Sequence, residues 1–278
     1  MVLLVIFASV GVTNTRIFSL MSRSVKLDMK GLVICGLVVL GLCLSMTVVG
    51  SAQDKETPAA KKQEPVPKEK LYWVFLTAGK SLEGIDRKEV EAMQTEHLSN
   101  FRRLAEEGKL LTAGPLSDPE NVLRGIVVLK SNQAESLIKM FDSDPYVKQG
   151  YMKIKSCPMQ FELGKIHTRV APKGMEELTL AILEINPDVE KKSDPKLMQQ
   201  TTNYLKSQYD TKKLDLSVRL FNASEPSGYG QVLIFPNKES PESITQILNQ
   251  IPAVKDGFWK PKTMPIFMGK GSIDREDN

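Results

Sequence analysis

The sequence predicts an α+β protein in which two tandem βαββαβ units pack against each other as a pseudo-dimer within one chain. A repeat supports this prediction, because residues 145–166 and 252–273, which lie 107 positions apart, are identical at nine positions. Ordinary composition would give about one or two matches over such a length. A chain of 278 residues is also long enough for two small domains. Finally, each half has the same order of strand-like and helix-like segments.

The first unit, predicted over residues 71–167, begins with a strand. Leu71–Thr77 is rich in aromatic and β-branched residues, which favour strands. Asp86 can cap a helix in which apolar residues recur at helical spacing as far as Gly108. The remaining elements are strands at 109–114 and 125–129, a helix at 132–141 and a strand at 151–163. This βαββαβ order is that of a ferredoxin-like unit, whose helices cover one face of an antiparallel sheet.

The second unit, predicted over residues 175–274, repeats this order. Its expected strands are 178–184, 214–220, 230–235 and 258–268, and its expected helices are 195–209 and 241–250. Because helices cover only one face of each sheet, the other face stays apolar and needs a partner. We therefore expect the two sheets to stack face to face within the chain.

The region before residue 71 has the composition of an export signal followed by a tether. Residues 31–50 contain no charged residue, follow several basic residues and end at the small residues 50–52. This pattern is typical of a signal peptide over 1–52, cleaved after Ala52, which would make the protein secreted or periplasmic. The alternative is an uncleaved membrane anchor, because about 20 apolar residues can span a bilayer. Residues 53–70 are rich in Lys, Glu and Pro and predict a disordered linker.

The start of translation is open as well, because Met21 or Met29 would serve as well as Met1 ahead of the apolar stretch. The formal net charge is +4, of which the first 52 residues contribute +3, so the rest of the chain is near +1. A body this close to neutral does not attract phosphate backbones over a distance, so we expect no nucleic-acid partner.

Cysteine and histidine are too scarce for several kinds of site. Cys157 is the only cysteine after the apolar leader, so the body can form no internal disulfide, and we interpret the thiol as packed and inert. With two histidines and no metal-ligand spacing, the sequence predicts no metal site. It also contains no glycine-rich phosphate loop, and we expect no cofactor.

Four motifs make the first unit resemble the YCII-related family. They are Glu96-His97-Leu98, the segment 107–116 (EGKLLTAGPL), Arg124-Gly125 and the segment 144–150 (DPYVKQG). The resemblance covers residues 71–165, and the second unit retains only the Pro-x-Val-Lys-x-Gly piece and the last strand. It implies a ferredoxin-like unit that dimerises into an α+β barrel, with a histidine–aspartate pair in a pocket. The family's activity is mostly unassigned; some relatives are dehydrochlorinase-like lyases, and the fold neighbours include lactone isomerases.

His97 and Asp144 are the candidate catalytic residues. His97 lies one turn from both Met93 and Phe101, so it shares the helix face that should look toward the sheet, whereas Arg103 is expected on the solvated face. A buried imidazole needs a partner, and Asp144, at the end of the neighbouring helix, can accept from one ring nitrogen and leave the other free to move a proton. Such a pair suits removal of a proton next to a carbonyl group.

Three further residues are candidates for ligand binding. Gly114 and Pro115 would let the backbone approach a ligand closely, and Tyr146 would form a wall of the pocket. The ligand would be a small molecule, specifically a small organic acid or a lactone.

The alternative is that His97 is a satisfied core histidine and that Asp144 only caps the turn before Pro145. In the second unit, the positions at the same offset of 107 are Tyr204 and Ile251, so the fold tolerates the loss of both polar groups. We therefore keep two hypotheses. Either the first unit is a lyase or isomerase that uses the pair as general acid and base, or the chain is a non-catalytic module that binds a small ligand or another protein. Assembly beyond the internal pseudo-dimer, such as a homo-oligomer, stays open.

Overall fold

The computed structural model describes residues 69–167, 174–188, 194–221 and 229–275, all of which belong to one compact unit. The predicted signal peptide at 1–52 and all but the end of the predicted linker at 53–70 lie outside the described residues. Within the described part, no helix is both long and apolar enough to cross a membrane.

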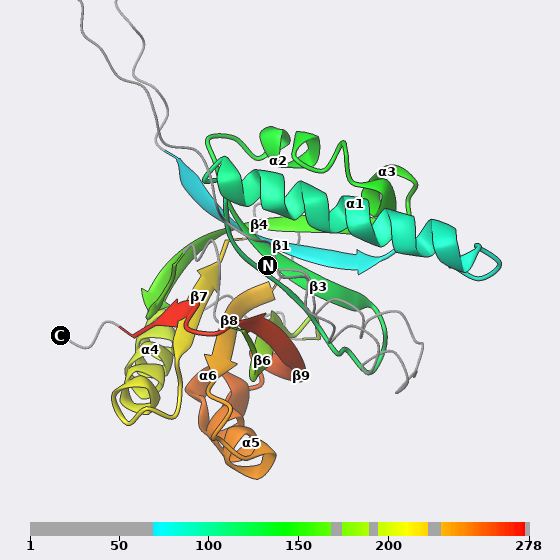
Figure 1. The fold of residues 1–278 in the computed structure, drawn as a ribbon. Coiled ribbons are helices and arrows are strands. Elements are labelled where there is room, and N and C mark those ends of the chain that lie inside the picture. The colour runs from blue at the N-terminus through cyan, green and yellow to red at the C-terminus, as the bar shows by residue number, and fades with distance from the viewer. Residues whose placement is uncertain (1–68, 168–173, 189–193, 222–228, 276–278) are drawn as a thin grey trace, which may run out of the picture. The chain divides into compact units, whose positions relative to one another are not determined.

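Both halves show the predicted βαββαβ order, and each has one additional short helix before its last strand (Figure 1). The first half contains β1 (Lys70–Ala78), α1 (Arg87–Glu106), β2 (Leu110–Pro115), β3 (Leu123–Ser131), α2 (Glu135–Lys139), α3 (Pro145–Lys148) and β4 (Met152–Leu163). The second contains β6 (Met175–Ile185), α4 (Pro195–Asp210), β7 (Leu216–Leu220), β8 (Tyr229–Phe235), α5 (Pro241–Gln250), α6 (Pro252–Lys255) and β9 (Trp259–Gly269). Two short strands, β5 (Lys165–Ile166) and β10 (Ile273–Asp274), pair with each other.

Strand register confirms the duplication. Leu71 of β1 pairs with Met159 of β4, and Leu178 of β6 pairs with Ile266 of β9. Both members of the second pair lie 107 positions after their counterparts. The two sheets therefore have the same central pairing, which a shared ancestry of the two halves explains.

The two halves join into one eight-stranded antiparallel sheet of order β2-β3-β1-β4-β7-β8-β6-β9. In the middle of this order, β4 pairs with β7 of the other half. Its two outer strands also meet, because Leu116 forms a bridge with Ile266 and the backbone N–H of Ser117 donates to Pro265 at 3.0 Å. The sheet thus closes through two seams between the halves, which is the arrangement of a dimeric α+β barrel built within one chain.

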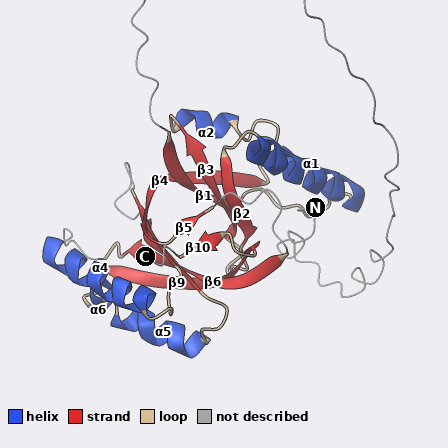
Figure 2. Cartoon of the chain, turned by 60° about the vertical axis from the view of Figure 1, so that its left-hand side comes forward, coloured by secondary structure: helices blue, strands red, loops and turns tan. Residues whose placement is uncertain are grey.

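Three apolar clusters follow from this arrangement. The inner cluster draws side chains from both halves, including Trp73, Phe75, Cys157, Ile182 and Ile266, so the predicted burial of the Cys157 thiol is confirmed. Two outer clusters pack helices α1–α3 on the first half of the sheet and helices α4–α6 on the second. Figure 2 shows the strands between these two groups of helices. The expected face-to-face burial is therefore reached by one continuous sheet that curves around its own core.

Ionic contacts reinforce the seam between β2 and β9. The ammonium of Lys262 in β9 lies 3.1 Å from Asp118 and 2.6 Å from Glu120, both in the loop after β2. The Asp118 carboxylate also accepts backbone hydrogen bonds, the shortest from Leu123 at 2.8 Å. Burial disfavours ionisation of Asp118, but these hydrogen bonds and Lys262 outweigh it and lower the pKa of that carboxyl below 3.8.

The pKa of Lys262 is raised above 10.5, because Glu120 and Asp118 outweigh the opposing effect of burial. A carboxyl whose pKa is lowered in the folded state stabilises the fold at pH values above its ordinary pKa, and that contribution is lost as the pH falls through the folded-state pKa. An ammonium whose pKa is raised in the folded state stabilises the fold at pH values below its ordinary pKa, and that contribution is lost as the pH rises through the folded-state pKa. The seam is therefore most stable between roughly pH 4 and pH 10.

Replacement of Lys262 by Met should lower the free energy of unfolding by about 2 kcal/mol near pH 7, because the buried Asp118 carboxylate loses its cation. The matched control is Lys260→Met, which removes an exposed pair with Asp188 and should cost about 0.5 kcal/mol or less. Urea unfolding of both variants, from about pH 2.5 to about pH 7, measures the effect. The difference from wild type should shrink on the acid side as Asp118 becomes protonated; equal losses for both variants would contradict the assignment.

Candidate functional site

Helix α1 carries His97 on the face that packs against the sheet. The helix begins after Asp86, whose side chain accepts a hydrogen bond from the backbone N–H of Lys88 at 2.8 Å. His97 is then three turns into the helix and shares its buried face with Met93 and Phe101, as the sequence spacing predicted. Only 1% of His97 is exposed.

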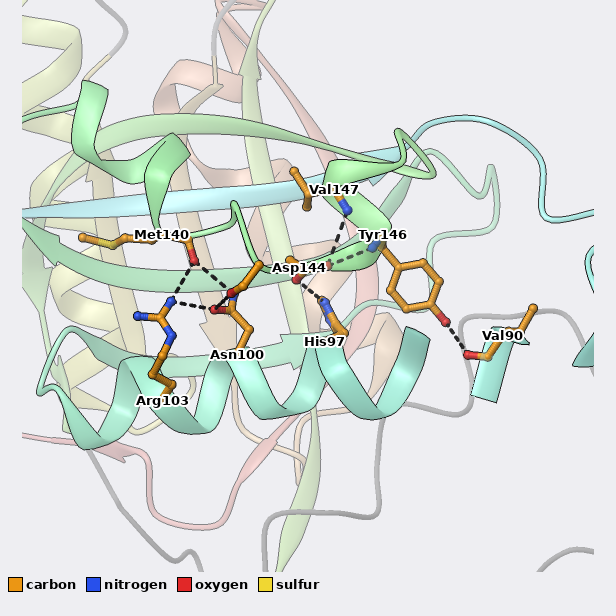
Figure 3. A network of polar contacts seen from close by, with 9 residues as sticks. Val90, His97, Asn100, Arg103, Met140, Asp144, Tyr146 and Val147 are labelled. Atoms are coloured by element: carbon orange, nitrogen blue, oxygen red, sulfur yellow. Dashed lines mark hydrogen bonds and ion pairs between the residues drawn. The ribbon is translucent and has the colours of Figure 1, made fainter. Parts of the chain in front are cut away.

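Asp144 uses its two carboxylate oxygens for two different purposes (Figure 3). One oxygen caps helix α3 and accepts from the backbone N–H groups of Tyr146 at 3.0 Å and Val147 at 3.4 Å. The other lies 2.5 Å from Nδ1 of His97. An ionised carboxylate can only accept, so this contact suits a proton on Nδ1, and a neutral ring with its proton there has its lone pair on Nε2. This is the tautomer that a general base requires.

Two aromatic rings fix the orientation of the imidazole. The ring of Phe101 lies 4.4 Å from that of His97, and the ring of Tyr146 meets it edge-on at 5.5 Å. The Tyr146 hydroxyl donates to the carbonyl of Val90 at 3.3 Å. Burial, and secondly the negative charge of Asp144, raise the pKa of Tyr146 to about 12, so the phenol stays neutral and keeps donating.

A second group of contacts, which the sequence analysis missed, holds the loop before Asp144 against α1. The amide nitrogen of Asn100 donates to the carbonyl of Met140 at 3.1 Å, and its oxygen accepts from Ser143 at 3.0 Å and Arg103 at 2.7 Å. Arg103 is exposed, as expected for the solvated face of the helix, but its guanidinium also donates to Asn100 and to the carbonyl of Met140. A usable signal existed, since residues 97, 100 and 103 recur every three positions along one side of the helix.

The predicted ligand-binding residues separate into two groups. Tyr146 lies beside the dyad, where it is 1% exposed. Gly114 and Pro115 lie in β2 at the seam with the second half, and no hydrogen bond or ring contact joins them to His97 or Asp144. A Cβ atom on Gly114 would come within 2.2 Å of the backbone oxygen of Phe267. The close approach that requires glycine here is that of strand β9, so Gly114 serves closure of the sheet.

In the second half, the counterpart of His97 is Leu205. His97 is the eleventh residue after the N-cap of its helix, Asp86, and Leu205 is the eleventh after Asp194, the N-cap of α4. The burial pattern agrees, since Leu205 is 1% exposed. The expectation of Tyr204 was therefore wrong by one residue, because the connection before α4 is one residue longer than the connection before α1. Ile251 replaces Asp144 as predicted.

The second half also replaces the structural duties of Asp144 and Asn100. Thr201 of α4 accepts from the backbone N–H of Ala253 at 3.1 Å, which is the contact that Asp144 makes with Tyr146. Tyr204 donates to the carbonyl of Ile247 at 3.1 Å, in the place where Asn100 donates to Met140. An apolar pair and two hydroxyls thus hold the same elements together, so this fold does not require a buried histidine–aspartate pair.

The second histidine lies outside this site. His167 follows β5, and its half-exposed side chain is 3.3 Å from Asp274. Among the residues that the structure describes, no group of three or more His, Cys, Asp or Glu side chains could hold a metal ion. The absence of a metal or cofactor stays a prediction.

Comparison with known proteins finds a family match within the first half. Residues 71–156 match the family model of the YCII-related domain. No curated protein has a significant match in sequence. Among solved structures, chlorite dismutase from Candidatus Nitrospira defluvii is 10% identical, with a TM-score of 0.46, and the match covers 71% of this chain and 90% of that chain. A heme-binding protein from Thermus thermophilus is 10% identical, with a TM-score of 0.43, over 74% and 95%. Similarity at this level says nothing about the chemistry of this chain.

Replacement of His97 by Leu alone should lower the free energy of unfolding by about 3 kcal/mol, because it leaves the buried Asp144 carboxylate without its partner. Addition of Asp144→Ile and Met93→Thr reproduces Leu205, Ile251 and Thr201 and should recover most of the loss. Urea unfolding of the single and triple variants measures both values. A triple variant less stable than His97→Leu would show that the first half depends on the pair for its fold.

Proposed function

Because residues 71–156 match the family model of the YCII-related domain, we propose that the first half of the chain catalyses proton transfer on a small carbonyl compound, with His97 as general base and acid and Asp144 as its orienting partner. The observation that carries the proposal is the 2.5 Å contact between Asp144 and Nδ1 of His97, buried in one half and replaced by an apolar pair in the other. Burial of a polar pair costs stability. Because the second half folds without such a pair, its presence in the first half points to a purpose other than folding.

In this proposal His97 transfers the proton and Asp144 stabilises the charge that forms on the imidazole ring. Nε2 of His97 takes a proton from the carbon next to a carbonyl group, and the ring becomes an imidazolium that the adjacent Asp144 carboxylate stabilises. The same nitrogen then returns the proton to another carbon, which moves a double bond, or the electron pair expels a leaving group. The first outcome is an isomerase reaction and the second a lyase reaction. Small organic acids and lactones contain such carbon acids.

Burial imposes one condition on this chemistry. His97 is 1% exposed, so a substrate reaches Nε2 only when neighbouring side chains move aside. Once a substrate is bound, the same burial excludes water and strengthens the attraction between imidazolium and carboxylate. The aromatic contacts of Phe101 and Tyr146 hold the imidazole ring of His97 in place while the substrate binds and reacts.

The isomerisation of α-angelica lactone provides a direct test, since it needs only removal of the proton next to the carbonyl and its return at the far end of the double bond. The conjugated product is detected by ultraviolet absorbance, and deuterium uptake from D2O into the lactone and into levulinate, followed by NMR, reports the first step alone. His97→Gln should lower the catalysed rate by about 100-fold or more. His167→Gln is the matched control, because it makes the same change at the other histidine.

Asp144→Asn is expected to lower the rate as well, because a neutral amide stabilises the imidazolium less than a carboxylate does. Asparagine is still a good N-cap, so the fold should persist. Asp194→Asn makes the same change at the N-cap of α4 and should leave the rate unaltered. Equal rates for wild type and His97→Gln with both compounds would rule out the proton-transfer proposal and leave a binding module as the better description.

We further propose that this reaction takes place outside the cytoplasm, on the strength of the apolar stretch at 31–50 and the small residues that follow it. Expression of the full chain in a secreting host should give a processed protein whose first residue is Gln53. Mass spectrometry of the purified N-terminus measures this. An intact leader in the membrane fraction would instead support the uncleaved anchor.

A further inference from the structure

Gln94 is a buried side chain of α1 whose amide nitrogen has no hydrogen-bond partner in the described part of the chain. It is 8% exposed. The other two buried polar side chains of this helix, His97 and Asn100, are both paired. A buried donor without an acceptor is unfavourable, and native proteins contain few of them. The amide therefore points to an acceptor that binds from outside the chain.

Helix geometry places the side chain of Gln94 beside that of His97 on α1. Gln94 comes three residues before His97, and Asn100 comes three residues after it. At about 100° per residue, these two side chains lie on opposite flanks of His97, each about 60° away. The flank of Asn100 is occupied by the loop that carries Asp144, to which Asn100 is bonded through Met140 and Ser143. The flank of Gln94 has no such polar partner for the amide nitrogen.

At the helix position of Gln94, a carboxamide side chain occurs only in the half that has the His97–Asp144 pair. Gln94 is the eighth residue after Asp86, and the eighth residue after Asp194 is Thr202. The neighbouring Thr201 caps α6, a duty that Asp144 performs in the first half. Neither half thus uses a carboxamide at this position to hold its own fold together.

We infer that the amide N–H of Gln94 donates a hydrogen bond to the carbonyl oxygen of the substrate whose adjacent C–H faces Nε2 of His97. This inference rests on the proposed function and assigns the residue that binds the carbonyl oxygen of its substrates, in which the carbonyl carbon is bonded directly to the acidic carbon. Residues three apart on a helix have Cβ atoms about 5–6 Å from each other. This spacing allows His97 to contact the acidic C–H of a substrate while Gln94 contacts the carbonyl oxygen of the same molecule.

The electron flow gives the amide a role in the reaction. When Nε2 takes the proton, the C–H bonding pair moves into the carbonyl group and produces an enolate, whose negative charge lies on the oxygen. A preplaced N–H donor stabilises that oxygen more in the enolate than in the starting carbonyl compound. Return of the proton to another carbon restores the carbonyl group, so the isomerisation needs no further reactant.

Gln94→Met tests this role, because methionine has a similar length and shape but no donor. The expected result is a fall of about 10-fold or more in kcat/KM for α-angelica lactone, the scale of one lost hydrogen bond. The melting temperature should stay unchanged or rise, because the variant removes an unsatisfied polar group. Gln199→Met, an exposed change on α4, is the control and should leave kcat/KM unaltered.

Binding of two unreactive compounds separates this role from general packing. γ-Valerolactone has the carbonyl oxygen, and its affinity measured by calorimetry should fall about 10-fold in Gln94→Met. 2-Methyltetrahydrofuran has the same ring without that oxygen, and its affinity should not change. Equal losses for both compounds, or no binding of γ-valerolactone to the wild type, would overturn the assignment of Gln94.

The two proposals fail in different ways. If His97→Gln abolishes isomerisation while Gln94→Met leaves both kcat/KM and γ-valerolactone affinity at the wild-type level, proton transfer stands and the role of Gln94 is wrong. If neither variant changes the rate of deuterium uptake, both proposals are wrong.

Discussion

Each half of this chain makes a sheet with two apolar faces, and its own helices can cover only one of them. The inner cluster, which includes Trp73 and Phe75 from the first half and Ile182 and Ile266 from the second, is where the remaining faces meet. Neither half can bury its inner face alone, so the association of the halves is a condition for folding. The two seams follow from this requirement: β4 pairs with β7, and glycine at position 114 lets β9 approach β2.

Duplication changes what each outer face must do. In a barrel made of two identical chains, any substitution in a site would affect both copies, whereas here the halves vary independently. The second half has Leu205 and Ile251 where the first has its buried histidine–aspartate pair, and Thr201 accepts the backbone hydrogen bond that corresponds to the one Asp144 accepts. Replacement of buried charged pairs by apolar residues is often neutral or stabilising. The role that remains for the second half is to cover the inner, apolar face of the first half's sheet.

The sequence predicted the elements and the pairing better than the details of the site. Strand patterns, the N-cap Asp86 and the repeat offset depend on local residue types, and they led to the correct order and to the correct pairing of His97 with Asp144. The counterpart of His97 was missed because the connection before α4 contains one extra residue. Matching positions in α1 and α4 are therefore 108 residues apart, whereas those in β1 and β6 are 107 apart. Gly114 was assigned to a ligand because a sequence cannot reveal which backbone approaches a glycine; that depends on closure of the sheet between distant strands.

The contrast between the two halves also bears on where function lies. A sequence selected for folding alone tends to satisfy its buried polar groups or remove them, and the second half has removed the histidine–aspartate pair, with Leu205 and Ile251 in its place. Helix α1 departs from that rule twice within one turn, by retaining an ionisable pair out of water and by leaving the Gln94 amide unmatched. Two such departures side by side are hard to attribute to drift, because each lowers stability separately. A bound carbonyl oxygen would satisfy the amide and place its acidic carbon before the imidazole, so a single ligand accounts for both.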